Sequence, residues 1–194
     1  MTHSIFLSAK NNSILITCAK NVVSYLRKEI ISMGFPIRSE FTAGIETEGT
    51  LEDSMTMNLM IRTGHRVLYF LKELQIHNPD ELYRGITEMP WEKYIAKDGF
   101  FSVTSHVNNP TIRDSRFANV KCKDAIADRF LKLYGLRPDS GSEKKGVVIY
   151  LYWSENRCGI YLDTSGEPLS KRGYRKIPLV APMQETLAAS LIMA

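Results

Sequence analysis

Hydrophobic and polar residues in the first part of the chain alternate between strand-like and helix-like spacing. The apolar run from Ile14 to Thr17 predicts a short strand. Between about residues 20 and 33 the spacing changes to one apolar residue every four positions, which predicts a helix whose apolar face carries Val22, Leu26 and Ile30. Gly34 stands where a glycine commonly ends a helix, so we expect this helix to end there.

The pattern then passes through a hairpin and a second helix before it returns to a strand. Residues 37–48 are β-prone and interrupted at Gly44, which predicts a hairpin or two short strands. Apolar residues at helical spacing predict a second amphipathic helix: Leu51, Met55 and Leu59. Residues 66–75 form another strand-like run. The order strand, helix, hairpin, helix, strand predicts a small ferredoxin-like α+β unit.

A second group of elements begins at Asn78. Asn78 can cap a helix and Pro79 suits its first position, so a helix is predicted from there to a break before Pro90. Residues 100–107 alternate as a strand does. A longer helix is predicted over residues 119–134, and it ends at Gly135 and carries an apolar stripe of Cys122, Ile126, Phe130 and Leu133.

The last third of the chain begins with a polar loop over residues 138–146. Two β-rich runs, residues 147–153 and 157–163, follow it and predict a hairpin. Residues 181–194 have a helical pattern that no stop signal ends, from which we expect a fragment of a longer protein.

The positive charge is concentrated in the second half of the chain. Of the net +4, residues 1–96 contribute ten Lys/Arg against eleven Asp/Glu, or −1, and residues 97–194 contribute fifteen against ten, or +5. A polyanionic partner is therefore expected to bind the second half.

Membrane, disulfide and metal functions find no support in the sequence. No apolar run approaches the roughly 20 residues that cross a bilayer, and no signal peptide is visible, so a cytoplasmic location is expected. The cysteines and histidines lack the spacing of disulfide frameworks or metal sites, and we expect them to pack in the core or face solvent: Cys18, Cys122, Cys158, His3, His65, His77 and His106.

No catalytic motif is visible either. The sequence has no phosphate-binding glycine loop, no HExxH and no GxSxG. Asp163 and Glu167 flank a basic loop, and we expect them to bind backbone groups and arginines rather than to act as catalysts.

Two basic segments have the chemistry to bind RNA. One contains Arg113, Arg116, Lys121 and Lys123 around Phe117, and the other is the loop of residues 170–176, with Lys171, Arg172, Tyr174 and Arg175. Guanidinium groups clamp phosphate with two hydrogen bonds, and aromatic or arginine planes stack on unpaired bases. The alternative is a solvated loop whose arginines neutralise nearby acids.

Four motifs in sequence order resemble one protein family. They are IRDSRF at residues 112–117, VKCKDAIADRF at 120–130, DTSGEPLSKRGYR at 163–175 and APMQETLAA at 181–189. Together they resemble the N-terminal region of bacterial THUMP-containing 23S ribosomal RNA guanine-N2 methyltransferases.

The resemblance implies a particular domain order. An α+β fold is expected, in which a ferredoxin-like unit over residues 1–76 packs with a THUMP domain over residues 77–165. Residues 166–194 would be a basic linker and first helix leading to a Rossmann-like methyltransferase domain that is absent here. That domain would use S-adenosylmethionine to methylate the exocyclic amine of a guanine.

The resemblance also implies a partner and an activity. The DPxCGSGT cofactor loop and the NPPY-type catalytic motif of the family are absent from residues 1–194, so this chain should hold no cofactor and be inactive alone. The expected partners are structured RNA, namely 23S rRNA, and the methyltransferase domain, with no metal and no membrane. The expected RNA contacts are eight residues of the two basic segments: Arg113, Arg116, Lys121, Lys123, Lys171, Arg172, Tyr174 and Arg175. We expect them to converge on one surface.

Two other interpretations remain open. Arg172 and Arg175 could instead tie this region to the methyltransferase domain, with Tyr174 packed between the domains. The whole chain could also be a protein-interaction module, in which the ferredoxin-like half offers a sheet edge or a helix face to a protein. A stand-alone enzyme would require a cluster of carboxylates in a closed pocket.

Overall fold

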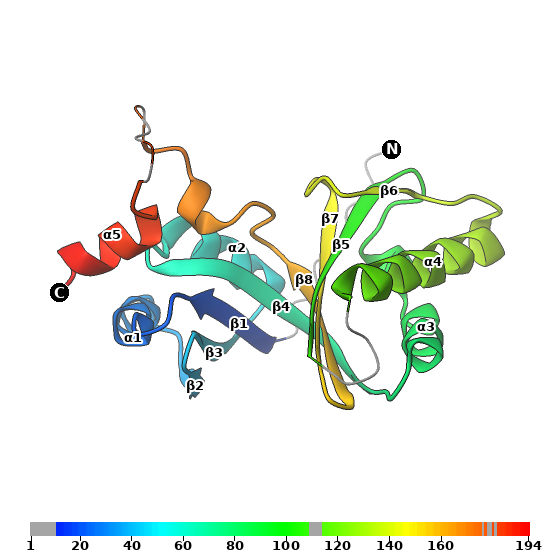
Figure 1. Ribbon diagram of the computed structural model, residues 1–194, viewed down its shortest axis with the longest axis horizontal. Coiled ribbons are helices and arrows are strands. Elements are labelled where there is room, and N and C mark those ends of the chain that lie inside the picture. Colours follow the sequence, from blue (N-terminus) through cyan, green and yellow to red (C-terminus); the bar gives the residue numbers. More distant parts are fainter. Residues whose placement is uncertain (1–10, 109–113, 176, 178–179, 181) are drawn as a thin grey trace. The chain divides into compact units, whose positions relative to one another are not determined.

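The computed structural model describes residues 11–108, 114–175, 177, 180 and 182–194 (Figure 1). The described chain divides into two compact units. We call residues 11–70 together with Asp163–Ala194 the first unit, and Leu71–Leu162 the second unit. Each has its own helices and its own part of a β-sheet.

The first unit has the predicted ferredoxin-like order of elements. Its strands lie in the order β2-β3-β1-β4, and the pairs β2–β3, β3–β1 and β1–β4 are antiparallel. This order confirms the βαββαβ prediction. The elements are β1 (Asn12–Cys18), α1 (Val23–Ser32), β2 (Ile37–Phe41), β3 (Gly44–Gly49), α2 (Leu51–Met60) and β4 (Gly64–Gln75).

The two helices of this unit differ in how well their buried faces were predicted. In α1 the predicted face is confirmed, since Val22, Leu26 and Ile30 are all buried. In α2 it is wrong, because Met55 is 46% exposed and Leu59 is 78% exposed.

The start of α2 explains why its face was predicted wrongly. Thr50 and Asp53 form a reciprocal capping box that fixes where the helix begins. With that start, Ser54 and Met57 turn inward and are fully buried, together with Ile61 just after the helix. A small serine therefore occupies a core position. Met55, Leu59 and Met60 lie on the outer face of α2 and remain exposed, Met55 at 46% and Met60 at 61%.

The second unit packs two helices on one face of its sheet. Its strands lie in the order β8-β7-β5-β6, with β7–β8 antiparallel and β5 parallel to both β7 and β6. Helices α3 and α4 lie on one side of β5 and β7 (Figure 1), where Leu82, Phe130, Ile149 and Trp153 belong to one buried core. The elements are α3 (Pro79–Thr87), η1 (Trp91–Lys93), β5 (Phe100–Asn108), α4 (Ser115–Tyr134), β6 (Asp139–Gly141), β7 (Val147–Ser154) and β8 (Arg157–Asp163).

Most end signals of the second unit are confirmed. The Asn78 side chain accepts hydrogen bonds from the backbone of Asp80 and Glu81 at the start of α3. Gly135 ends α4 in the left-handed region, with φ of 70°.

Three expectations for this unit were inaccurate. Helix α4 begins at Ser115 rather than Asn119, because Asp114 caps it by accepting from the Arg116 backbone. Leu133 does not belong to the buried stripe and is 49% exposed. The short strand β6 was predicted as loop, since its sequence, DSG, has no hydrophobic pattern.

The segment after β8 returns to the first unit. It contains the short helix η2 (Leu169–Lys171) and the final helix α5 (Glu185–Ile192), which contact each other. The expected start of this last helix, residue 181, lies outside the described residues.

A buried carboxylate holds the turn that follows α2. Glu29 on α1 is 5% exposed and accepts hydrogen bonds from the backbone and side chains of Arg62 and Thr63, including 2.6 Å from the Thr63 hydroxyl. Replacing Glu29 with alanine leaves the donors of the buried Thr63 without an acceptor and removes the ion pair with the exposed Arg62. We expect Glu29→Ala to lower the free energy of unfolding by roughly 2–4 kcal/mol, measured by urea denaturation.

Glu40→Ala is the matched control. Glu40 pairs with Arg27 at 3.0 Å, but both side chains are exposed, at 39% and 55%. The control should change stability by less than about 1 kcal/mol. Equal effects of the two substitutions would contradict a structural role for Glu29.

Candidate nucleic-acid interface

The segment that leads from β8 to the basic loop begins at a buried carboxylate. The Asp163 side chain is fully buried, pairs with Arg66 on β4 and accepts a hydrogen bond from the Ser165 backbone at 3.1 Å. Arg66 also donates to the carbonyl of Gly166 at 2.9 Å. Asp163 therefore binds an arginine and the backbone, as predicted, and orients the chain as it leaves β8.

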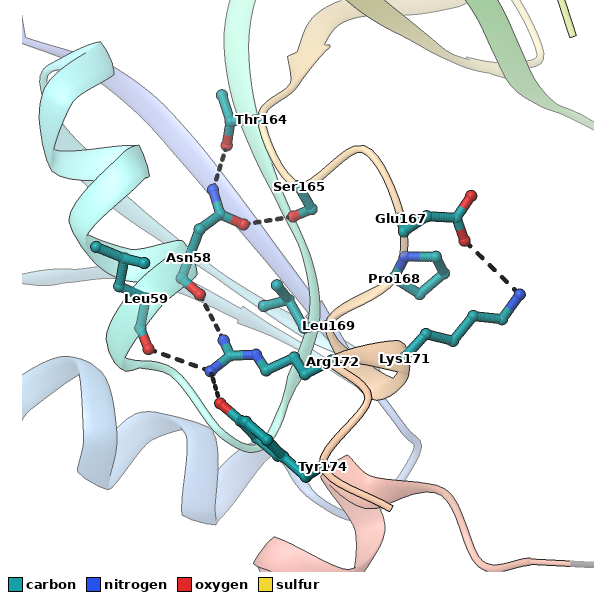
Figure 2. Close-up of a pocket in the computed structure, with 10 residues that line it drawn as sticks. All are labelled: Asn58, Leu59, Thr164, Ser165, Glu167, Pro168, Leu169, Lys171, Arg172 and Tyr174. Atoms are coloured by element: carbon teal, nitrogen blue, oxygen red, sulfur yellow. Dashed lines mark hydrogen bonds and ion pairs between the residues drawn. The ribbon is translucent and has the colours of Figure 1, made fainter. Parts of the chain in front are cut away.

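Three small polar side chains continue this attachment. Asn58 of α2 donates to the Thr164 hydroxyl at 2.8 Å and accepts from the Ser165 hydroxyl at 2.6 Å (Figure 2). The Ser165 hydroxyl in turn accepts from the backbone of Val67 on β4 at 2.8 Å. Residues 164 and 165 are thus bound both to α2 and to β4.

Arg172 closes the carboxyl end of α2. Its guanidinium donates to the carbonyls of Asn58, Leu59 at 3.1 Å and Ile61 at 2.6 Å. The last turn of α2 has no basic residue of its own, and the carbonyls there carry the negative end of the helix dipole. Arg172 thus supplies, from over 110 residues away in the sequence, the cation that the helix end lacks.

A pocket of about 410 Å³ lies beside these contacts (Figure 2). Its rim carries Tyr174, which is 71% exposed, and Lys171, whose side chain is 70% exposed. Lys171 pairs with Glu167 at 3.7 Å, so the partner of Glu167 in this pair is a lysine rather than the expected backbone group or arginine. Such an exposed pair contributes little to stability, so a phosphate can replace the carboxylate at small cost.

Arg175 is bound within the same unit. Its guanidinium donates to the Met183 carbonyl at 2.8 Å, and its backbone N–H donates to Glu185 at 3.3 Å. Arg172 and Arg175 therefore have partners in the first unit itself. Lys176, at the end of this basic segment, lies outside the described residues.

The other basic segment lies in the second unit. Arg116 is 89% exposed in its side chain and pairs with Asp114 at 2.8 Å, and this pairing lowers the pKa of Asp114. Lys121 lies 3.4 Å from Asp80, and Lys123 donates to the Gly141 carbonyl at 2.8 Å. Arg113 lies outside the described residues.

The eight expected contact residues thus fall into two groups on separate units. Seven are described, and Arg116, Lys121 and Lys171 each have an acidic partner while Lys123, Arg172 and Arg175 bind carbonyl oxygens. Their convergence on one surface, and their contact with RNA, stay predictions. The hydrogen bonds of Arg172 were not predicted from the sequence, because their acceptors are backbone carbonyls and no pattern of side chains indicates them.

Metal and thiol chemistry finds no support in the residues that the structure describes. All three cysteines are buried, and burial raises the pKa of Cys18 to about 11 and that of Cys158 to about 12. Within the described ranges, no three His, Cys, Asp or Glu side chains gather closely enough to hold a metal ion. His3 lies outside those ranges.

Among the described helices, none combines the length and the apolar character that crossing a membrane requires.

The Arg172 contacts lead to a stability prediction. Because Arg172→Ala removes three hydrogen bonds and a charge at a helix end, we expect it to lower the free energy of unfolding by roughly 1–3 kcal/mol in urea denaturation. Lys171→Ala, next to it and paired only at the surface, should cost under about 0.5 kcal/mol. Indistinguishable values for the two variants would rule out this capping role.

Two family models match most of the chain. Residues 13–68 match the RlmL ferredoxin-like domain, and residues 77–163 match the THUMP domain.

Relatives and solved structures agree with these matches. The ribosomal RNA large subunit methyltransferase K/L of Psychromonas ingrahamii is 37% identical over 180 residues, which are 93% of this chain and 24% of that protein. A possible methylase from Clostridium difficile 630 superposes with a TM-score of 0.81 at 25% identity, over 95% of this chain and 48% of the other. SMU.472, solved as a complex with SAH, shares the fold with a TM-score of 0.79 at 22% identity, over 95% and 48% of the two chains.

These comparisons define what the chain contains. It spans about a quarter of the length of the curated relatives that it matches. Its first unit has the topology, and its residues 13–68 the sequence, of the RlmL ferredoxin-like domain. The chain therefore contains an RlmL-type ferredoxin-like domain followed by a THUMP domain.

Proposed function

We propose that this chain is the RNA-recognition region of an S-adenosylmethionine-dependent 23S rRNA guanine-N2 methyltransferase acting in the cytoplasm. The observation that carries the proposal is a THUMP domain joined to an RlmL-type domain, with exposed cations on both units. Phosphate contacts would supply most of the affinity, and RNA shape and unpaired bases would supply selectivity.

The residues of this chain do not fit the cofactor. The sequence has no glycine-rich cofactor loop. In the described pocket Asn58 hydrogen-bonds to Thr164 and Ser165, Lys171 pairs with Glu167, and Arg172 binds backbone carbonyls. S-adenosylmethionine would therefore be held by the remainder of the longer protein, which would also perform the methyl transfer.

Exposed apolar side chains near the carboxyl end support a further domain as a partner. Ile177 is 80% exposed, Val180 is fully exposed and Ile192 is 87% exposed. Side chains this exposed leave apolar surface that a partner domain can cover. We expect the methyltransferase domain to cover them.

A protein-interaction module is the second candidate, and one observation favours it. The outer face of α2 exposes Met55, Leu59 and Met60. Such a face could bind an apolar surface of a protein without any nucleic acid. Retention of RNA or of protein by the immobilised chain from one lysate, with and without ribonuclease, distinguishes the two candidates.

Salt dependence tests RNA binding by the basic loop. The Lys171→Gln/Arg175→Gln double variant keeps Arg172, and with it the end of α2. Since each phosphate contact contributes about 0.7–0.9 to the slope of log affinity against log salt, we expect the loss of two contacts in the double variant to reduce that slope by about 1.4–1.8. Fluorescence anisotropy with a labelled rRNA hairpin, titrated from low to moderate salt, measures it.

The matched control is Arg27→Gln/Lys28→Gln on α1, where two exposed cations lie outside either basic segment. This control should keep the wild-type slope. An unchanged slope in the Lys171→Gln/Arg175→Gln variant would show that these loop residues do not contact the RNA.

A further inference from the structure

The sheet of the second unit has an aromatic face turned away from its helices. Side chains alternate along β7, so Ile149, Leu151 and Trp153 belong to the core that the helices α3 and α4 cover, while Tyr150 and Tyr152 lie on the opposite face of the strand. Tyr152 is 45% exposed. A tyrosine at this exposure keeps much of its ring in solvent.

Tyr152 is already stacked on a neighbour. His106 is its partner in the parallel β5–β7 register, and it is also exposed. The two rings lie 5.5 Å apart, centroid to centroid, with their planes only 9° from parallel. This is the offset-stacked geometry that aromatic pairs favour, and further flat rings can extend such a stack.

A glycine makes room for a third ring. Gly159 on β8 is the antiparallel partner of Tyr152. A Cβ atom at Gly159 would come within 2.7 Å of a Tyr161 ring carbon, so the Tyr161 ring occupies the space above this glycine. Tyr161 also contacts Tyr150 at 6.4 Å, centroid to centroid. We call His106, Tyr150, Tyr152 and Tyr161 the aromatic platform.

A guanidinium lies at the edge of the platform. Arg157 is two residues from Gly159 on the same strand face, and its side chain is 67% exposed. Glu73 accepts from it at 2.8 and 3.2 Å. This ion pair orients Arg157, and its exposure leaves the guanidinium accessible to a phosphate.

We propose that the aromatic platform stacks unpaired bases of a single-stranded RNA segment, with Arg157 binding the adjoining phosphate. The inference rests on the proposed function and assigns a second, base-reading surface to it. Single-stranded RNA suits the platform because paired bases do not expose their flat faces, whereas aromatic side chains stack on any unpaired base. The platform's phenol and imidazole rings, rather than aliphatic chains, favour bases over an apolar protein surface.

Cross-strand aromatic pairs also stabilise sheets, so the test must separate binding from folding. The variants are Tyr152→Leu, which removes the ring, Tyr152→Phe, which keeps it, and His106→Ala, which removes its stacking partner. Phe41→Leu is the matched control, because Phe41 is an aromatic residue of a strand in the first unit with 53% exposure. Thermal unfolding of each variant establishes that it is folded at the assay temperature.

The probes are an unstructured RNA decamer containing 2-aminopurine and an rRNA hairpin that has no unpaired flanks and is closed by a compact tetraloop whose bases stack on one another. Stacking should quench 2-aminopurine fluorescence on binding of the wild-type chain. We expect Tyr152→Leu to bind the decamer about tenfold more weakly with an unchanged salt slope, since it loses a stacked base and no phosphate contact. Tyr152→Phe and Phe41→Leu should bind within about twofold of wild type, and hairpin binding should be unaffected.

Each other outcome has a distinct meaning. Wild-type decamer affinity in both Tyr152→Leu and His106→Ala would overturn the platform, while the salt-dependent hairpin binding would leave the proposed function standing. Failure of the wild-type chain to bind either RNA would overturn the proposed function. If Tyr152→Leu does not fold, His106→Ala decides the question alone.

Discussion

The capping of α2 by Arg172 is the interaction on which the arrangement of the basic loop depends. Three carbonyl oxygens at one helix end meet a single guanidinium, so the segment that follows β8 is fixed to the ferredoxin-like domain rather than free in solution. Glu29 holds the turn that follows α2 through hydrogen bonds from Arg62 and Thr63. With Arg172 engaged, Lys171 and Tyr174 remain directed to solvent at the rim of the pocket.

The basic residues differ in the partners that they bind. Arg172 has a structural partner inside the domain, while Arg116 and Lys171 have exposed acidic partners that phosphate can replace. Phosphate binding distinguishes poorly among sequences, so selectivity has to come from another surface. The platform around Tyr152 has the chemistry to supply it.

Local signals in the sequence predicted the fold well. The ferredoxin-like order followed from the alternation of strand and helix spacing, and the ends of α3 and α4 followed from Asn78 and Gly135. The buried face of α2 was missed, because a buried serine carries no hydrophobic signal and the capping box set the phase of the helix instead. Strand β6, three polar residues long, likewise had no pattern to detect.

The candidate sites were less predictable for a related reason. The acceptors of Arg172 are backbone carbonyls distant in the sequence, and residue type does not identify them. Tyr150 and Tyr152 alternate visibly along β7, but their neighbours His106 and Tyr161 are known only from strand register. The sequence thus located the charged residues. The structure was needed to distinguish the side chains that are bound within the protein from those that can bind RNA.

The central claim, that exposed cations and aromatic rings of these two domains contact RNA, is tested most directly by crosslinking. Ultraviolet irradiation of the chain bound to 23S rRNA fragments, followed by mass spectrometry, identifies the amino acids that touch nucleotides. The account predicts crosslinked peptides from residues 114–123 and 171–175 and from β7 around Tyr152. Crosslinks confined to α1 and the β2–β3 hairpin, or none at all, would contradict it.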